Sequence, residues 1–271
     1  MKLGEALGQP LVVDNRSGAG GTIATDIAAK APADGYTILV SNISLAVNAT
    51  LYRNLPYDTL RDLAPVTTIG QQPNILVVHP SVPANSLREL LALIKARPGQ
   101  INYGSGGFGT STYLATELLK LMTRLEMVHV PYKGLGPALT GLLGGQVQLI
   151  ISTLAPALPQ VKAGRLRALA VTTAKRSAFV AEIPTMSEAG VTGYDFSTWY
   201  GLWLPAGTPK NIVVRLNRET EKLLNSADAL EQFNAQGVEP LHLPSEQFAA
   251  YVRSEVEKWG KVIRATGARP E

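Results

Sequence analysis

Cysteine is absent from this chain of 271 residues, and histidine is rare. Without cysteine, disulfides, thiolate nucleophiles and cysteine-ligated metals are excluded. The three histidines, His79, His129 and His242, have no spacing typical of paired metal ligands. No arrangement of Ser, His and Asp stands out as a catalytic triad, and no pair of carboxylates suggests acid–base work. We therefore expect no metal, no cofactor and no catalytic residues.

Long apolar runs and long runs of one charge are also missing. No apolar segment approaches the roughly 18 residues that a membrane-spanning helix needs. Residues 1–8 contain Glu5 and no apolar stretch follows them, so no export signal is visible. The net charge of +4 includes no run of five or six basic residues, which argues against a nucleic-acid partner. A mildly positive field would help an anionic ligand approach.

Apolar segments of strand length alternate with amphipathic segments of helix length along the chain. Strands are expected at residues 11–14, 36–40, 74–78, 101–103, 127–130, 147–151, 166–172 and 196–204. Helices are expected at residues 21–30, 86–97, 110–123, 137–143, 157–163, 211–225 and 246–266. This alternation predicts an α/β protein with mixed, mainly parallel sheets covered by helices.

The length allows two compact lobes, and extended stretches near Gln100 and Tyr200 suggest where the chain crosses between them. We assign residues 1–100 and 200–271 to lobe 1 and residues 101–199 to lobe 2. Two crossings would form a hinge with a cleft, as in clamshell binding proteins that close on a ligand. Trp199 and Trp203 in the second stretch fit the packing of a hinge better than contact with a substrate.

The most informative segment is Tyr103–Ser111, which has four glycines between a short strand and a helix. Glycines let the backbone turn sharply and approach a ligand, and the start of a helix offers unpaired N–H groups to an anion. The alternative is a tight turn in which Thr110 simply caps the helix. The segment lacks the Gly-Lys-Ser/Thr ending of a P-loop, and Tyr103 replaces the first glycine of a nucleophile elbow. We predict an anion-binding loop.

Three further pairs of residues follow strands of the predicted sheets. Lys133 and Gly134 could supply a positive charge and exposed backbone donors, although a solvated lysine in a turn fits as well. Ser152-Thr153 and Ser41-Asn42 place polar groups at strand ends, where open α/β sheets bind ligands, or they cap the next helix. The glycines of residues 18–23 do not complete a dinucleotide fingerprint, and we interpret them as helix-entry packing.

Several motifs, taken in order, resemble the tripartite tricarboxylate transporter substrate-binding family, also called Bug receptors. They are Pro10-Leu11-Val12-Val13-Asp14-Asn15-Arg16, Gly18-Ala19-Gly20-Gly21, Asp34-Gly35-Tyr36-Thr37, Leu55-Pro56-Tyr57-Asp58, Val130-Pro131-Tyr132-Lys133-Gly134, Ile183-Pro184-Thr185, Glu188-Ala189-Gly190, Trp199-Tyr200-Gly201-Leu202 and Pro205-Ala206-Gly207-Thr208-Pro209. Each motif is weak alone, but the ordered series spans the chain and is specific.

The resemblance implies a type II periplasmic-binding-protein fold and a small carboxylate ligand: a di- or tricarboxylate, an aromatic acid or an acidic amino acid. It implies a periplasmic receptor, expected to be monomeric, that delivers its ligand to a membrane permease with a large and a small subunit. Family receptors hold the carboxylate through backbone amides, hydroxyls and waters. Carried onto this chain, the implied ligand-binding residues are Ser41, Asn42, Ser105, Gly106, Gly107, Gly109, Thr110, Lys133, Gly134 and Thr153.

The start of the chain departs from the family pattern. The family begins with a strand, a loop rich in proline and glycine and the first half of a helix, whereas residues 1–9 resemble only the second half of that helix. We expect weaker ligand binding and unpaired strand edges as a result. Two other functions stay open: a sensing module without a transport role, and a hydrolase of small esters. Turnover of generic esters would reveal the hydrolase, and a permease encoded alongside would argue against the sensing module.

Overall fold

The computed structural model describes residues 2–16 and 18–267, and the chain divides into two compact units. Unit 1 comprises Met1–Gln71 and Trp199–Glu271, and unit 2 comprises Gln72–Thr198. The first boundary therefore lies near residue 71 and not near Gln100, which corrects the division expected from the sequence. The reason is that residues 74–78 pair with strands of unit 2, so that the segment 72–100 packs there.

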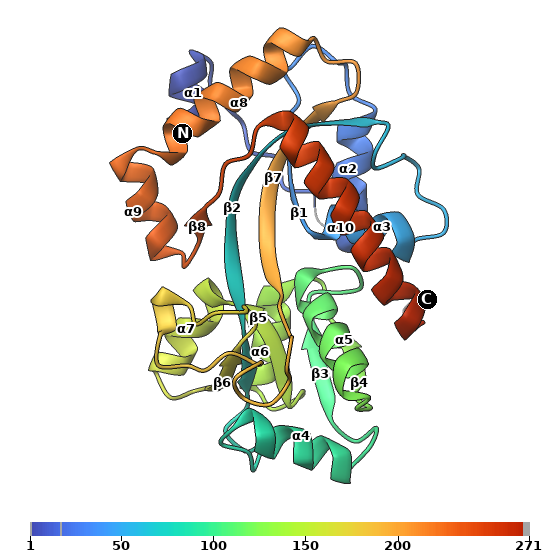
Figure 1. Ribbon diagram of the computed structural model, residues 1–271, viewed down its shortest axis with the longest axis vertical. Coiled ribbons are helices and arrows are strands. Elements are labelled where there is room, and N and C mark those ends of the chain that lie inside the picture. Colours follow the sequence, from blue (N-terminus) through green and yellow to red (C-terminus); the bar gives the residue numbers. More distant parts are fainter. Residues whose placement is uncertain (1, 17, 268–271) are drawn as a thin grey trace. The chain divides into compact units, whose positions relative to one another are not determined.

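The secondary structure follows the expected alternation, with additional elements (Figure 1). The helices are α1 (Lys2–Leu7), α2 (Thr22–Ala29), α3 (Ser44–Leu51), α4 (Leu87–Ala96), α5 (Ser111–Thr123), α6 (Leu135–Leu143), α7 (Leu154–Lys162), α8 (Lys210–Leu224), α9 (Ala227–Ala235) and α10 (Ser245–Thr266). The strands are β1 (Leu39–Asn42), β2 (Leu63–Val78), β3 (Asn102–Ser105), β4 (Val128–Pro131), β5 (Leu149–Thr153), β6 (Arg167–Val171), β7 (Ser197–Pro205) and β8 (Glu239–Pro240). Short 3-10 helices lie at Ala19–Gly21 and Ala178–Val180.

The sheet of unit 2 is mixed. Its strands follow the order β2–β5–β3–β4, and β3 runs parallel to both β4 and β5. The second half of β2 pairs antiparallel with β5 and also with β6. Parallel pairing among the described ladders is thus confined to β3, β4 and β5, which are joined by helical crossovers, whereas antiparallel pairs need no crossover. The core of this unit packs α6 and α7 against β2 and β5 through side chains such as Val77, Leu142 and Ile150.

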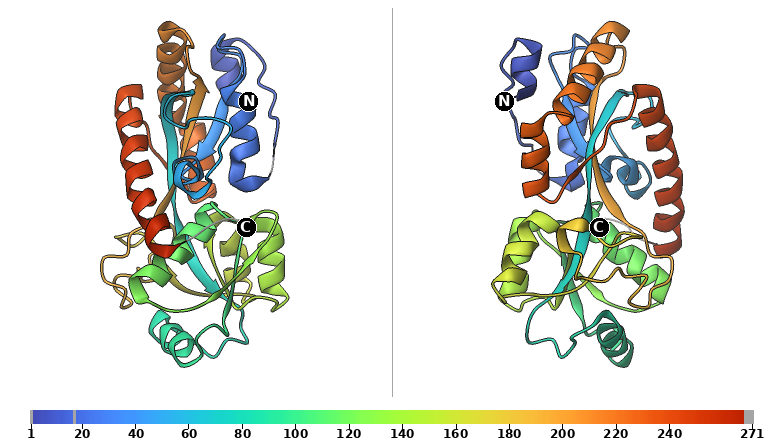
Figure 2. Two further views of the ribbon diagram at one scale, coloured as in Figure 1. Left: turned by 90° about the vertical axis from the view of Figure 1, so that its right-hand side faces the viewer. Right: turned by 60° about the vertical axis from the view of Figure 1, so that its left-hand side comes forward.

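Unit 1 contains antiparallel ladders between β1 and β7 and between β2 and β8. Both views in Figure 2 show α10 running beside the part of β2 and β7 that belongs to this unit. Phe248 of α10 stacks edge-on against Trp199 of β7, with the ring centroids 5.9 Å apart. Trp199 and Trp203 are 1% and 0% exposed, so these tryptophans are core residues. Their predicted role in a hinge stays a prediction.

The strand expected at residues 11–14 is absent, and this prediction was wrong. The segment is irregular, and the side chains of Val12 and Val13 are 91% and 61% exposed. An apolar run forms a strand only when another strand completes its hydrogen bonds. Among residues 2–16 and 18–267 no strand pairs with this segment.

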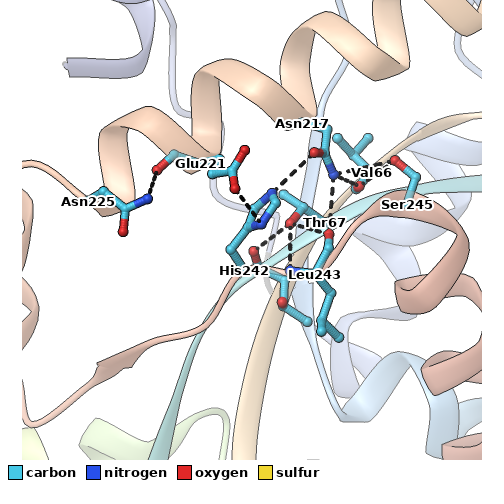
Figure 3. A network of polar contacts seen from close by, with 9 residues as sticks. Val66, Thr67, Asn217, Glu221, Asn225, His242, Leu243 and Ser245 are labelled. Carbon is cyan, nitrogen blue, oxygen red and sulfur yellow. Dashed lines mark hydrogen bonds and ion pairs between the residues drawn. The ribbon is translucent and has the colours of Figure 1, made fainter.

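A polar network fixes the connection between β8 and α10 within unit 1 (Figure 3). The Asn217 side chain donates to the carbonyl oxygens of Val66 and Leu243 at 2.7 and 3.2 Å, and its Oδ1 lies 3.1 Å from Nε2 of His242. Ser245 Oγ also donates to Val66, at 2.7 Å. His242 therefore belongs to a hydrogen-bond network that connects α8 and β2 to the segment before α10.

None of the helices within the described ranges combines the length and the apolar character needed to cross a bilayer. Those ranges likewise hold no group of three His, Asp or Glu side chains placed to share a metal ion.

Candidate functional site

The carboxyl ends of β5, β3 and β4 lie along one edge of the unit 2 sheet, because these strands are parallel neighbours. Each strand leads directly into a helix: β3 into α5, β4 into α6 and β5 into α7. We call this the strand-end edge and define it by Ser105–Thr110, Tyr132–Gly134 and Thr153. Three helix N-termini therefore begin at one edge, where unpaired N–H groups and helix dipoles favour an anion.

The glycine-rich loop Ser105–Thr110 turns with a geometry that needs its glycines. Gly107 and Gly109 have φ angles of 110° and 74°, in a region that other residues rarely adopt. The amide of Gly106 donates to Thr112 Oγ1 at 2.9 Å, and the hydroxyl of Thr110 donates to the Gly107 carbonyl at 2.6 Å. The loop is thus closed on itself by side chains at the start of α5.

The loop Tyr132–Gly134 packs directly against the glycine-rich loop. The amides of Tyr132 and Gly134 donate to the carbonyls of Ser105 and Gly106 at 3.0 and 3.2 Å. A Cβ atom added to Gly106 would lie 3.2 Å from the backbone nitrogen of Leu135, so a larger residue would fit there only if the neighbouring loop shifted by a few tenths of an ångström. The two loops predicted from sequence are therefore brought together. The exposed Lys133 side chain has no ion pair with any described residue.

The start of α5 keeps hydrogen-bond donors unpaired. Thr110 occupies the N-cap position, but its side chain makes no capping bond, because its hydroxyl is directed to Gly107. The amides of Phe108 and Gly109 make no hydrogen bond to any residue that the structure describes. Thr110 is therefore at the N-cap position without a side-chain cap, and the amides of Phe108 and Gly109, in the loop just before α5, stay available for an anion.

A serine and a histidine meet beneath this loop. Ser105 Oγ lies 2.6 Å from Nε2 of His129, and the amide of Gly107 donates to the same oxygen at 3.0 Å. Burial, together with the positive charge of Lys120, lowers the pKa of His129 to about 4. Ser105 is fully buried, and Nδ1 of His129 has no partner in the described chain, so no carboxylate orients the ring as in a catalytic triad.

The other residues predicted from sequence lie as follows. Thr153 is the N-cap residue of α7 and makes no side-chain cap, so its hydroxyl adds to the strand-end edge. Ser41 and Asn42 end β1 in unit 1, and Asn42 Oδ1 accepts the amide of Ser44 at 2.9 Å. The side chain of Asn42 thus bonds to the first amide of α3 from the residue before the N-cap, Ile43, which has no side-chain cap of its own.

Sequence reasoning missed the roles of Thr112 and His129. Thr112 lies within the first turn of α5, where nothing in the sequence indicates that it bonds back to Gly106. His129 precedes the motif Val130–Gly134, but its contact with Ser105 depends on the parallel register in which Tyr103 of β3 pairs with His129 of β4. Only the position beside a recognised motif could have drawn attention to it.

Comparison with known proteins supports the resemblance seen in the sequence. Residues 1–268 match the Tripartite tricarboxylate transporter family receptor. Protein BugT of Bordetella pertussis is 41% identical over 269 residues, which cover 98% of this chain and 82% of the relative.

Solved structures agree with this match. A structure of Rpa4515 from R. palustris with adipate shares 39% identity and a TM-score of 0.94, covering 100% of this chain and 91% of that one. Periplasmic binding protein BugD shares 30% identity and a TM-score of 0.93, with the same coverages of 100% and 91%. MatC from Rhodopseudomonas palustris, with bound malate, shares 30% identity and a TM-score of 0.88, covering 97% of this chain and 90% of that one.

These neighbours confirm the mixed α/β, type II periplasmic-binding-protein fold class that the sequence predicted. The family match and the relatives named Bug confirm the resemblance itself. The chain therefore belongs to the tripartite tricarboxylate transporter receptor family.

Proposed function

We propose that this chain is an extracytoplasmic receptor that captures a small carboxylate, with unit 2 binding the carboxylate at the strand-end edge. The observation that carries the proposal is the start of α5, where donors stay unpaired because Thr110 does not cap the helix. The amides of Phe108 and Gly109 and the exposed Lys133 offer an anion both hydrogen bonds and a positive charge. Charge-assisted hydrogen bonds of this kind contribute about 1.5–3 kcal/mol each.

Two solved relatives support a more specific proposal for the ligand class. Rpa4515 was solved with adipate and MatC with malate, and both are small dicarboxylates. We propose a ligand of this class, with tricarboxylates, aromatic acids and acidic amino acids as the wider range. In unit 1, Ser41 stays a candidate contact, and Asn42 can contribute its amide group while its oxygen accepts the amide of Ser44.

The proposal also includes where the protein works in the cell and which molecules it binds. A receptor of this family would work in the periplasm and deliver its ligand to the two-subunit permease, acting as a monomer without nucleic acid. One observation favours the alternative interpretation as an ester hydrolase, namely the contact between Ser105 and His129. That serine is fully buried and His129 has no carboxylate partner in the described chain, so we propose a binding protein and not an enzyme.

A thermal-shift screen of organic acids, including adipate and malate, tests the proposal directly. A ligand present at about 100 times its dissociation constant stabilises the fold by about 2.7 kcal/mol. The melting temperature should rise with at least one small carboxylate and not with neutral analogues of the same size. Absence of any rise, or turnover of small esters by the parent protein, would contradict the proposal.

The variant Gly107→Leu tests whether the carboxylate binds at the glycine-rich loop. Gly107 has a φ of 110°, and Leu there would strain the turn and crowd the Tyr132 carbonyl, which lies 3.3 Å from an added Cβ. Gly190→Leu is the matched control, because Gly190 has a similar φ of 119° with nothing within 4 Å of an added Cβ. We expect a loss of affinity of tenfold or more only in the first variant. Equal affinities for both variants would place the carboxylate elsewhere.

A further inference from the structure

We propose that His129 is a positioning residue, which holds the glycine-rich loop in the conformation that binds the carboxylate. This inference rests on the proposed function of that loop. His129 lies on β4, which pairs with β3 immediately before the loop, and it contacts the loop at two points. One contact is the hydrogen bond to Ser105, and the other is the packing of its ring against Phe108.

The hydrogen bond to Ser105 has a definite direction. Ser105 Oγ already accepts the amide of Gly107, so its proton is available to donate. The nitrogen of His129 lies at 2.6 Å, whereas the Gly107 carbonyl lies at 3.3 Å, so the hydroxyl donates to Nε2. The chain of bonds then runs from the Gly107 amide through the Ser105 hydroxyl to the imidazole. The histidine thus helps to fix the amide orientation of Gly107, whose positive φ glycine adopts readily and other residues rarely adopt.

The ring of His129 is also held on three sides. It stacks on Tyr103 with centroids 4.9 Å apart, contacts Phe108 edge-on at 4.8 Å and lies 4.8 Å from Tyr113. Phe108 belongs to the loop itself, whereas Tyr103 and Tyr113 belong to β3 and α5. The rings thereby link the loop to both elements that flank it. Removal of the imidazole would leave Phe108 without this support and the loop free to take other conformations.

The charged groups around the ring favour its neutral form. Lys120 of α5 forms an ion pair with Glu117 at 2.8 Å and lies 5.6 Å from the centroid of the Tyr103 ring. The Tyr103 hydroxyl donates to Glu117 at 2.5 Å, so the carboxylate is directed to Tyr103 and Lys120. Nδ1 of His129 has no acceptor among the described residues. A positive imidazole would therefore be poorly compensated, and the neutral ring accepts the hydrogen bond from the Ser105 hydroxyl at Nε2.

Two variants and a matched control test this role. His129→Phe keeps an aromatic ring but removes the hydrogen bond, and Ser105→Ala removes the same bond with a smaller change. His79→Phe is the control, because His79 Nδ1 lies 2.7 Å from Ser81 Oγ in a comparable pair at the surface of the same unit. Hydrogen exchange of a peptide covering residues 104–112 reports loop order without any ligand, and calorimetric titration with adipate and malate reports affinity. In the parent protein, nitrogen NMR of the imidazole should show a neutral Nδ1–H ring at pH 6.

We expect exchange in the loop to rise at least tenfold, and affinity to fall at least tenfold, in His129→Phe and Ser105→Ala but not in His79→Phe. Unchanged exchange in the first two variants would overturn the proposal, as would faster exchange with unchanged affinity. Faster exchange in a protein whose parent binds none of the acids would contradict the proposed function while supporting the control of the loop by His129.

Discussion

Thr110 stands where a helix cap would be expected, yet its hydroxyl bonds to Gly107 and leaves the first turn of α5 uncapped. A helix start without a cap loses about 1 kcal/mol relative to a capped one. The unpaired donors retain their capacity to bind an anion. We therefore propose that the uncapped helix start favours anion binding at a cost in local stability, and substitutions of single residues at the strand-end edge test this.

Lys133 provides the first test at this scale. Its exposed ammonium group has no ion pair among the described residues, so it can attract an anionic ligand. Lys133→Gln should lower the affinity for adipate severalfold at low ionic strength. The loss should shrink with added salt, because the Debye length falls from about 10 Å at 0.1 M to about 3 Å at 1 M.

The control is Lys162→Gln at the far end of α7, about 13 Å along the helix from the edge by its rise per residue. Calorimetric titrations of both variants with adipate at two salt concentrations measure the two losses of affinity. A salt-independent loss in Lys133→Gln, or an equal loss in the control, would contradict a direct electrostatic role.

His129 gives a pH dependence with a definite sign. Burial, and next the charge of Lys120, lower its pKa from 6.5 to about 4. The unfolded chain therefore takes up a proton below about pH 6.5 that the folded protein does not take up until about pH 4. The contribution of this residue to the free energy of unfolding is complete above pH 6.5, decreases as the pH falls toward 4 and levels off below.

Denaturant unfolding of the parent and of His129→Phe between pH 4 and 7.5 measures this contribution. The parent should lose more stability than the variant across that window, since Phe cannot take up a proton. Glu117 and the other carboxylates are common to both proteins and cancel in the difference. Parallel curves for the two proteins would contradict a depressed pKa.

At the scale of elements, periodicity and capping predicted much of the fold. The helix expected at residues 86–97 forms as α4, capped by Ser86, and its Leu87, Leu90 and Ile94 are buried, whereas Leu91 is only half-buried. Elements without such signals were missed. The first part of β2 is interrupted in sequence by Pro65, Gly70 and Pro73. The helix α3 is buried over six of its eight residues and lacks an amphipathic pattern.

In the candidate site, too, some features could be predicted from the sequence and others could not. The glycine-rich loop could be predicted because its chemistry resides in the backbone and in the residue types of one short segment. The contacts between this loop and Tyr132–Gly134, and between Ser105 and His129, depend on strand register. Register is a tertiary property that no local pattern encodes. The exposed segment 11–14 shows the opposite error, in which a local pattern predicted a strand that does not form. Its apolar character gives no strand because no partner strand pairs with it among the described residues.

The cap of α4 allows a test that separates stability from binding. Ser86 Oγ accepts the amide of Glu89 at 3.2 Å, so Ser86 caps α4. Glu89 Oε2 in turn accepts the amide of Asn85, the residue before the cap, at 2.7 Å. Ser86→Ala should lower the free energy of unfolding by about 1 kcal/mol. Affinity for an acid should not change, because α4 leads into the start of β3 and not its carboxyl end.

Urea unfolding and calorimetric titration of the same preparation provide both numbers, with Ser86→Thr as the conservative variant that retains the cap. Loss of affinity in Ser86→Ala at temperatures where it stays folded would mean that the binding residues lie nearer to α4 than we propose.

At the scale of the whole molecule, β2 and β7 each contribute residues to both units. Unit 1 is assembled from two segments of the chain, whereas unit 2 is the continuous segment Gln72–Thr198. Unit 2 alone carries the parallel strands, the three helix starts and the two contacting loops. The chain belongs to the receptor family, and we propose that the strand-end edge of unit 2 binds the ligand.

Glycine-selective nitrogen NMR of the full chain tests the central claim most directly, because glycines mark both the strand-end edge and control sites. Titration with adipate or malate should shift the amide signals of Gly106, Gly107, Gly109 and Gly134 in a saturable manner. Gly99 and Gly190, which lie outside the strand-end edge, should shift little. Saturable shifts at the control glycines alone, or no shifts with any small carboxylate, would contradict the claim that this chain is a carboxylate receptor that binds at the strand-end edge.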